Sequence, residues 1–392
     1  MSPLRSLVSW LLLLLLAGGS LAAQEPAAAD TAPKRPKGFV ITPFIAPGYT
    51  PEMGGLLTLG ALMTFPTTPA VKPGTQEPVQ RSTLIFNGSY STTKAVNVNA
   101  KLSTFRRGDR LRLFVDFAYK DMPDEYWGVG YEAGTAPESD SATSYQRSSW
   151  LLFPKMLFRI SHSIMIGGAL DFNATTASDV SPGMAAEPYY QQFGADNFNS
   201  GGGLVFQLDS RDIAANPWVG VYVNAQALTY GTALGGDNTY QIYDVDYRQY
   251  RGLSRPGKTL AWTLRTRVGH GEVPWAELSQ IGTSNDLRGY RLGRYRHKAM
   301  LYGIVEYRHQ FLNAKREGGM SRHGFVVWLG AGSVGEDLAD LEQVLPNWGV
   351  GYRFEVQPRM SVRMDLGFGK EFYSSGNSAF EPSVYFNFTD AF

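Results

Sequence analysis

The chain has 392 residues, a formal net charge of +1 and no cysteine. Without cysteine the folded protein cannot be held together by disulfides. The near-neutral charge implies neither a nucleic acid nor an acidic surface as partner. Beyond the N-terminal segment, no apolar stretch is long enough to form a membrane-spanning helix.

The N-terminal segment has the organisation of a secretory signal peptide. Arg5 precedes an apolar run from Leu7 to Ala17, and small residues follow as far as Ala23. This order of charge, apolar core and small-residue cleavage site predicts a signal peptide over residues 1–23. The apolar run is too short to cross a bilayer as a helix.

Residues 24–38 form a short segment rich in alanine and proline. This composition predicts a periplasmic linker, and its length excludes a folded domain. No comparable change in composition follows, so we expect residues 39–392 to form one domain.

The rest of the chain is dominated by alternation of apolar and polar residues. Within residues 359–370, one face carries Met360, Val362, Met364, Leu366 and Phe368, and the other carries Arg359, Ser361, Arg363, Asp365 and two glycines. Successive side chains of a strand point to opposite faces, so this pattern predicts a strand with one apolar and one charged face.

About sixteen such segments follow one another, each near the roughly 9–11 residues with which a tilted strand crosses a membrane. In chain order they are residues 39–48, 54–65, 82–92, 95–106, 109–120, 144–160, 162–174, 198–210, 217–230, 239–252, 257–270, 296–312, 321–335, 346–356, 359–370 and 379–392. An even number of strands closes into an antiparallel barrel that leaves no backbone edge in lipid. The sequence therefore predicts an all-β fold, a 16-stranded antiparallel transmembrane β-barrel in the bacterial outer membrane. The alternative is a soluble β-protein with its apolar face inward.

The longest connection between late strands, residues 271–295, contains the run NDLRGYRLGRY. At ~3.3 Å per residue, half of this connection extends roughly 40 Å, which is far enough to fold deep into the lumen. Its Leu287, Arg288, Gly289 and Tyr290 resemble the motif at the tip of the lumen-inserted loop in the BamA/TamA superfamily, which comprises outer-membrane insertases and two-partner secretion translocators.

Other stretches match the same superfamily in the same order along the chain. The run GGGLVFQLDSRDIAANPWVG resembles the strand and turn that carry the family's D-T-R-D-x-x-x-x-P-x-x-G motif. The matching positions are Asp209, Arg211, Asp212, Pro217 and Gly220. YTPEMGG, DEYWGVGYE and VEYRHQF resemble further family stretches, so the likeness covers nearly all of residues 39–392.

The resemblance implies that Arg288 is a structural pin that bonds acidic side chains on the inner wall. Glu306 occupies one of the matching acidic positions, but Gly330 stands where the family has the second acid. Asp365, on the polar face of a later strand, is the candidate substitute. Gly289 would allow the tight loop tip and Tyr290 would pack against the wall. The alternative is that Arg288 is an ordinary solvated loop arginine.

The seam between the first and last strands has its own features. Pro43 and Pro47 lie in the first strand, and the last strand is expected to run to Phe392 on its apolar face. Proline donates no ladder hydrogen bond, so this first strand is expected to pair weakly. The family opens its barrel at this seam, whereas the alternative reading is simple tolerance of proline at an edge strand.

The resemblance implies that the barrel assists the insertion or translocation of proteins, or of lipids, at the outer membrane. Family insertases carry polypeptide-transport-associated domains before the barrel, and residues 24–38 are too short to form one. The expected partners are therefore outer-membrane lipid, client outer-membrane proteins and a separate periplasmic delivery protein. A passive channel, or a structural barrel subunit of a larger complex, remains the alternative.

An enzyme is not expected. The five histidines, His162, His270, His297, His309 and His323, are scattered, and no H-E-x-x-H spacing or phosphate-binding glycine loop occurs. The sequence therefore predicts no catalytic residues, no metal site and no cofactor.

Overall fold

The computed structural model describes residues 38–50, 54–67, 79–135, 143–315, 319–372, 378–388 and 390–392. The predicted signal peptide and residues 24–37 of the predicted linker lie outside these residues. None of the described helices is long and apolar enough to cross a membrane.

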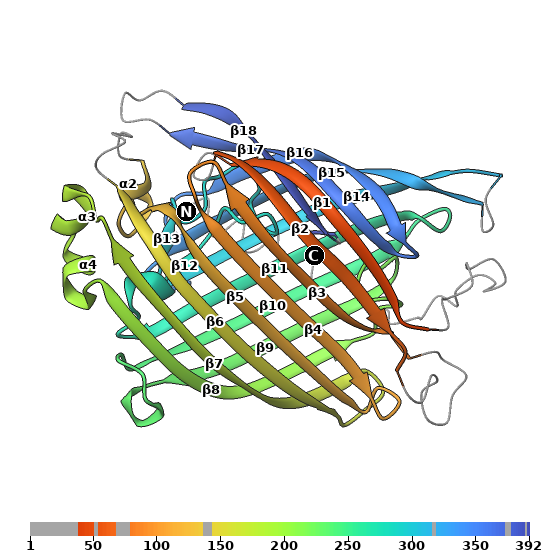
Figure 1. The fold of residues 1–392 in the computed structure, drawn as a ribbon, viewed down its shortest axis with the longest axis horizontal. Helices are drawn as coiled ribbons and strands as arrows, with labels where there is room; N and C mark the ends of the chain where they lie inside the picture. Colours follow the sequence, from red (N-terminus) through yellow and green to blue (C-terminus); the bar gives the residue numbers. More distant parts are fainter. Residues whose placement is uncertain are drawn as a thin grey trace.

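One antiparallel sheet of 16 strands accounts for nearly all of the described chain (Figure 1). Its strands, in sheet order, are β1 (Val40–Thr50), β2 (Gly54–Phe65), β3 (Ser82–Ser91), β4 (Val96–Arg106), β5 (Leu111–Glu125), β6 (Ser144–Arg159), β7 (Ile164–Ser178), β8 (Asp196–Asp209), β9 (Gly220–Tyr230), β10 (Tyr240–Gly252), β11 (Lys258–Gly271), β14 (Ala299–Leu312), β15 (Met320–Gly335), β16 (Leu345–Gln357), β17 (Met360–Phe372) and β18 (Ser378–Phe388). Sheet order is thus chain order, as in an up-and-down barrel.

The remaining elements lie in the connections. They are α2 (Tyr131–Gly134), α3 (Pro182–Ala186), α4 (Pro188–Phe193), η2 (Thr232–Leu234), η3 (Trp275–Glu277), β12 (Ser279–Gln280) and β13 (Arg296–His297). Strands β12 and β13 pair only with each other, within the connection between β11 and β14.

The predicted sixteen-stranded antiparallel sheet is confirmed, and most boundaries agree within a few residues. Two predictions were wrong in detail. The strand expected from residue 296 is interrupted, because residues 296–297 pair with β12 and β14 begins at Ala299. The last strand was expected to run to Phe392, but β18 ends at Phe388.

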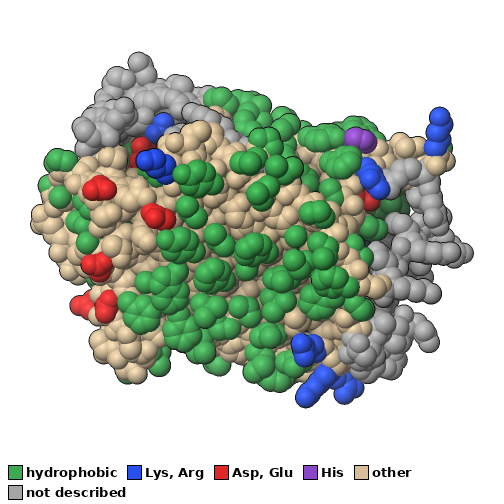
Figure 2. All heavy atoms as spheres, viewed as in Figure 1, with side chains coloured by type: hydrophobic (Ala, Val, Ile, Leu, Met, Phe, Trp, Pro, Cys, Tyr) green, Lys and Arg blue, Asp and Glu red, His purple; other side chains and the backbone are tan. Residues whose placement is uncertain are grey.

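The two faces of the sheet have opposite chemistry. Large apolar side chains are exposed on the outer face, with Leu204 at 72% and Leu329 at 68%. The inner face carries buried polar side chains such as Asn199, Glu306 and Asp365. Figure 2 shows apolar side chains spread over the middle of the visible outer surface, with charged side chains confined to its two ends. This is the inverse of a soluble protein and suits a lipid surround.

The two ends of the barrel also differ. At one end, short turns such as residues 107–110 and 160–163 join neighbouring strands. At the other end, longer connections carry α2, α3 and α4 (Figure 1). We refer to these as the short-turn end and the long-loop end.

The face assignment predicts which substituted side chains meet water. The lumen-facing Lys101 has 63% of its side chain exposed, and the outward-facing Phe86 is 47% exposed. In detergent micelles, Lys101→Cys is expected to react rapidly with a small charged thiol reagent, whereas Phe86→Cys is expected to be shielded by detergent. Because the chain has no native cysteine, mass spectrometry after timed labelling measures this directly. The reverse order of rates would contradict the face assignment.

Candidate functional site: the lumen loop and its ion-pair ring

The connection between β11 and β14 folds into the lumen. Its side chains are packed rather than solvated, since Leu287, Tyr290 and Tyr295 are each at most 1% exposed. They share one apolar cluster with wall residues of β14, β15 and β16, among them Trp328 and Leu345. The loop therefore has its own packed interface with the barrel wall.

Arg288, at the tip of this loop, contacts two carboxylates. Its Nη1 donates to Asp365 Oδ2 at 2.7 Å, and its Nη2 donates to Glu306. All three side chains are fully buried. A buried guanidinium bonded to two carboxylates is held by charge-assisted hydrogen bonds from both sides. The structure thus places Arg288 between Glu306 and Asp365 and away from solvent, the arrangement that a structural pin requires.

Strand β15 contributes an aromatic face to Arg288. The guanidinium carbon lies 3.6 Å from the ring centroid of Trp328, two residues before Gly330. Such stacking is attractive because the ring face carries partial negative charge. Trp328 was not predicted from the sequence. It lies two residues from Gly330 and therefore on the same inward face of the strand, so an aromatic contact to Arg288 could have been predicted. The second carboxylate comes instead from Asp365 in β17.

The contacts of Arg288 belong to a closed ring of ion pairs. Glu306 pairs with Arg308 at 2.9 Å, and Arg308 with Asp390 at 3.5 Å. Asp390 pairs with Arg353 at 2.8 Å, and Arg353 with Asp365 at 2.5 Å. Asp365 returns to Arg288 and also accepts from Arg363 at 3.0 Å. We call Arg288, Glu306, Arg308, Asp390, Arg353 and Asp365 the ion-pair ring.

Members of the ion-pair ring come from the loop tip, three strands and the last residues of the chain. Every carboxylate in it has at least two cationic neighbours. Buried charges are tolerated only when paired in this way. Removing one member therefore leaves its neighbours with fewer opposite charges in a buried site.

Phe392 lies in the lumen, which corrects its predicted place at the seam. Its carbonyl oxygen accepts from Arg308 Nη2 at 2.9 Å, and its ring centroid is 5.0 Å from the Arg308 guanidinium carbon. Phe392 and Ala391 are each 6% exposed and pack in the same cluster as Tyr250. The chain thus turns inward after β18, because the charge of Asp390 would otherwise face lipid.

The loop tip touches bare backbone on β17. Gly289 has φ +117°, and a Cβ there would lie 2.3 Å from the backbone nitrogen of Gly369. Gly289 N donates to the Tyr385 hydroxyl at 3.0 Å, and the Tyr290 hydroxyl donates to the Pro346 carbonyl at 2.7 Å. The amide of Asn347 donates to the Arg288 carbonyl. Gly289 and Tyr290 therefore seat the tip against the wall.

Two acidic residues shape the part of the loop that precedes this tip. Asp286 accepts from the backbone of Gly282 and Thr283 at 2.8 Å each, and burial raises its pKa. Nearer β11, Arg267 Nη1 donates to the Glu277 carbonyl at 2.7 Å. Burial raises the pKa of the Glu277 carboxyl to about 7, opposed by the Arg267 charge. These contacts fix the loop where it leaves the wall.

The family turn motif lies at the short-turn end. Asp209 pairs with Arg112 at 2.7 Å and with Arg211 at 2.9 Å. At Gly220, which has φ +116°, a Cβ would lie 2.5 Å from the Ser210 carbonyl oxygen. The motif thus closes a tight turn whose first carboxylate is neutralised inside the barrel wall. Pro217 precedes Trp218 within this turn.

Asp212 reaches across the mouth of the barrel. Its Oδ2 accepts from Arg359 Nη2 at 2.7 Å, and Arg359 belongs to the turn between β16 and β17. The Arg359 guanidinium carbon also lies 3.6 Å from the Trp218 ring centroid, and its Nε donates to the Asn216 carbonyl at 2.9 Å. The turn between β8 and β9 is therefore clamped to a turn several strands away.

The seam between β1 and β18 differs from every other junction in the sheet. The strands lie side by side, yet the hydrogen-bonded order of the described strands begins at β1 and ends at β18. Side chains of β16 reach over instead: Gln357 donates to Thr42 of β1 and accepts from Thr64 of β2 at 3.5 Å. Pro43 and Pro47 keep an unshifted register with β2.

Among the described residues, no group of three or more His, Asp or Glu side chains is arranged to hold a metal ion. The charged side chains of the lumen instead form ion pairs that connect the loop, the C-terminal residues and two turns to the barrel wall. The chemistry of this site is structural hydrogen bonding within a membrane wall.

The fold and this site define an outer-membrane β-barrel with a lumen-inserted, arginine-pinned loop. The Omp85 superfamily domain matches residues 81–382. The chain therefore belongs to the Omp85 superfamily, which confirms the resemblance carried by the Leu-Arg-Gly-Tyr loop. Proteins of this kind reside in the outer membrane of Gram-negative bacteria, and their short turns face the periplasm.

Solved structures show the same fold at low sequence identity. BamA from Haemophilus ducreyi lacking POTRA domains 1–3 is 15% identical with a TM-score of 0.57, over 91% of this chain and 71% of that one. CdiB from Escherichia coli is 10% identical with a TM-score of 0.55, over 91% of this chain and 63% of that one. The chain thus spans less than two thirds of the CdiB chain. No curated protein has a matching sequence.

Proposed function

We propose that the barrel assists the insertion or translocation of proteins, or of lipids, at the outer membrane by opening the seam between β1 and β18. The observation that carries the proposal is this seam, the one junction of the described sheet that lacks a backbone ladder. Each net backbone hydrogen bond contributes about 1 kcal/mol. A junction without a ladder therefore separates at far lower cost than its neighbours.

The prolines of β1 support the same proposal. Pro43 and Pro47 are four residues apart, so their missing N–H groups fall on one edge of the strand. The pairing of β1 with β2 is regular at both prolines. We therefore infer that the missing N–H groups lie on the other edge of β1, which faces β18. The seam edge of β1 then lacks two donors that a full ladder needs.

The packed side of the lumen, beside β14 to β17, favours the proposal over the alternative of a passive channel. At the level of the ion-pair ring, Arg288, Glu306 and Asp365 are fully buried between the loop and the wall. Solutes would have to displace the loop to pass between it and the wall formed by β14 to β17. Client outer-membrane proteins, with a separate periplasmic protein for their delivery, are the partners that fit the proposal.

A locked seam tests the proposal. Thr42→Cys with Gln357→Cys, joined by a short bismaleimide, ties β1 to β16 across the seam where the two side chains meet. In cells whose only copy is locked, we expect at least one outer-membrane or exported protein to fall several-fold, as measured by quantitative proteomics. The unlocked double variant is expected to behave like the parent.

The matched control joins two lumen-facing strands that are already paired. Asn87 and Asn99 are register partners, and their side chains are hydrogen-bonded at 3.2 Å. Cross-linking cysteines at these two positions adds the same chemistry without touching the seam. If the locked seam and this control leave the same protein composition, the barrel does not act by seam opening, and a structural role in a larger complex becomes the better reading.

A further inference from the structure

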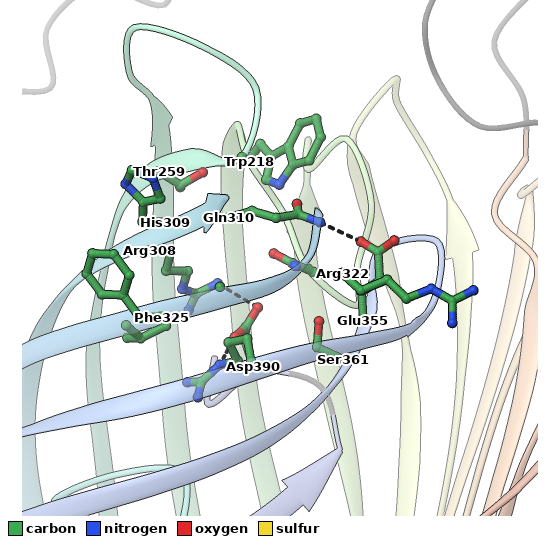
Figure 3. Close-up of a pocket in the computed structure, with 15 residues that line it drawn as sticks. Trp218, Thr259, Arg308, His309, Gln310, Arg322, Phe325, Glu355, Ser361 and Asp390 are labelled. Atoms are coloured by element: carbon green, nitrogen blue, oxygen red, sulfur yellow. Dashed lines mark hydrogen bonds and ion pairs between the residues drawn. The ribbon is translucent and has the colours of Figure 1, made fainter. Parts of the chain in front are cut away.

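A small cavity lies in the lumen at the short-turn end (Figure 3). Its volume is about 30 Å³, enough for about two water molecules. It is lined by Asn216 and Trp218 of the turn between β8 and β9 and by residues near the ends of β14 to β17. Arg308, Arg353 and Asp390 also line it, so the cavity borders the ion-pair ring.

The last three residues occupy this region as a ligand would. Asp390 is bonded between Arg308 and Arg353, and the Phe392 carbonyl and ring both engage Arg308. Ala391 and Phe392 pack in one cluster with Tyr250 of β10 and Ala261 of β11. Arg308 thus contacts a carboxylate, a carbonyl and an aromatic ring of the tail, and Arg353 holds the same carboxylate from the other side.

The wall offers more donors than this tail uses. Nη1 of Arg308 and Nη2 of Arg353 are buried without a hydrogen-bond acceptor, although Nη1 lies 3.5 Å from Asp390 Oδ2. The two arginines are only 5% and 7% exposed. A buried donor without an acceptor is destabilising, because it has lost its hydrogen bonds to water. A segment that supplies further acceptors would therefore bind here more favourably than the tail does.

We propose that Arg308, Arg353 and Tyr250 form a peptide-binding site for a segment in which a carboxylate precedes an aromatic ring by two residues. Residues 390–392 fill this site in cis as a tethered competitor. The tether gives the tail a high effective concentration, typically millimolar or above, so the parent protein presents a blocked site. The inference does not depend on seam opening, and either can fail alone.

The first test measures release of the tail. Ala391→Cys places a single thiol beside Asp390 in a chain without cysteine. We expect slow reaction with a small maleimide, and at least tenfold faster reaction after Asp390→Asn. Ala339→Cys, on an exposed connection, reports the unhindered rate. Glu132→Gln, an exposed carboxylate at the long-loop end, is the matched control and should leave the rate unchanged.

The second test measures binding in trans. A fluorescein-labelled Thr-Asp-Ala-Phe amide is expected to bind Asp390→Asn saturably in fluorescence anisotropy, and to bind the parent at least tenfold more weakly. Thr-Asn-Ala-Phe amide should not bind, and adding Arg353→Gln should abolish binding of the first peptide. Heat-dependent gel mobility checks that each barrel is folded. If Asp390→Asn does not fold, Phe392→Leu removes the aromatic contact instead.

Two results would overturn the proposal. Equal thiol rates in the parent and in a folded Asp390→Asn variant would show that the tail is not held by its carboxylate. Equal peptide affinities of the parent and the variant, or binding by neither, would show that the wall is not a receptor for this class of segment.

Discussion

Arg288→Ala is expected to release the lumen loop from the wall while the sheet remains folded. Breaking a buried ion pair by removing one partner typically costs about 3–5 kcal/mol, and Arg288 leaves two fully buried carboxylates behind. That cost corresponds to a rise of roughly 100-fold to several thousand-fold in the population of the open loop. Trypsin cleavage after the buried Arg294 reports this population.

The control for Arg288→Ala is Arg106→Ala, which removes an exposed arginine at the end of β4. Its cleavage rate should match that of the parent. Double-mutant cycles that combine Arg288→Ala with Glu306→Gln or with Asp365→Asn then measure the coupling free energy of Arg288 with each carboxylate separately. If both cycles are additive within about 0.5 kcal/mol, Arg288 is not a pin and the loop is held by its apolar contacts alone.

Gly289→Ala is expected to unseat the loop tip without removing any charge. The backbone at Gly289 has φ +117°, and the new Cβ would lie 2.3 Å from Gly369 N and 2.4 Å from the Phe368 carbonyl carbon. Both are backbone atoms of β17, which cannot rotate away. Overpacking of this kind costs about 1–3 kcal/mol beyond the backbone strain, and the same trypsin assay measures it.

Gly194→Ala separates the strain from the clash. Gly194 has φ +73° and ψ −172°, and a Cβ there meets nothing within 4 Å. This control carries backbone strain without a clash. It lies away from the loop tip, although the Gly194 carbonyl accepts from Trp275 Nε1 near the start of the loop at 2.9 Å. If the two substitutions lower the midpoint of thermal unfolding equally and neither exposes the loop to trypsin, the close approach of Gly289 to β17 has no energetic weight.

The strands were predictable because the two faces of each strand meet different media. Lipid outside and a polar lumen inside impose a period of two, and this alternation alone locates β2 at residues 54–65. The loop was predictable from the four-residue motif at Leu287 to Tyr290. Glu306 and Asp365 could be proposed as partners of Arg288 because both have inward parity.

The ion-pair ring as a whole could not be predicted. Arg353 and Arg308 lie on different strands, and their meeting at Asp390 depends on barrel curvature that alternation does not encode. One signal for the tail was available and was missed. Asp390 has the same parity as Val384 and Phe386, which face outward, so an unbroken strand would have placed its carboxylate in lipid. The strand therefore had to end before residue 390.

The uneven filling of the lumen has a mechanical consequence. Inward side chains of β3 to β5 such as Asn87, Asn99 and Asp116 are partly exposed, whereas those of β14 to β17 are buried against the loop and the tail. A sheet whose inner face packs against other side chains resists bending. A sheet whose inner face contacts only water resists bending less. The packed part of the wall contacts the loop through β17, whereas β1 belongs to the other part. We therefore expect deformation under load to concentrate in the first strands and to be smallest in the opposite wall.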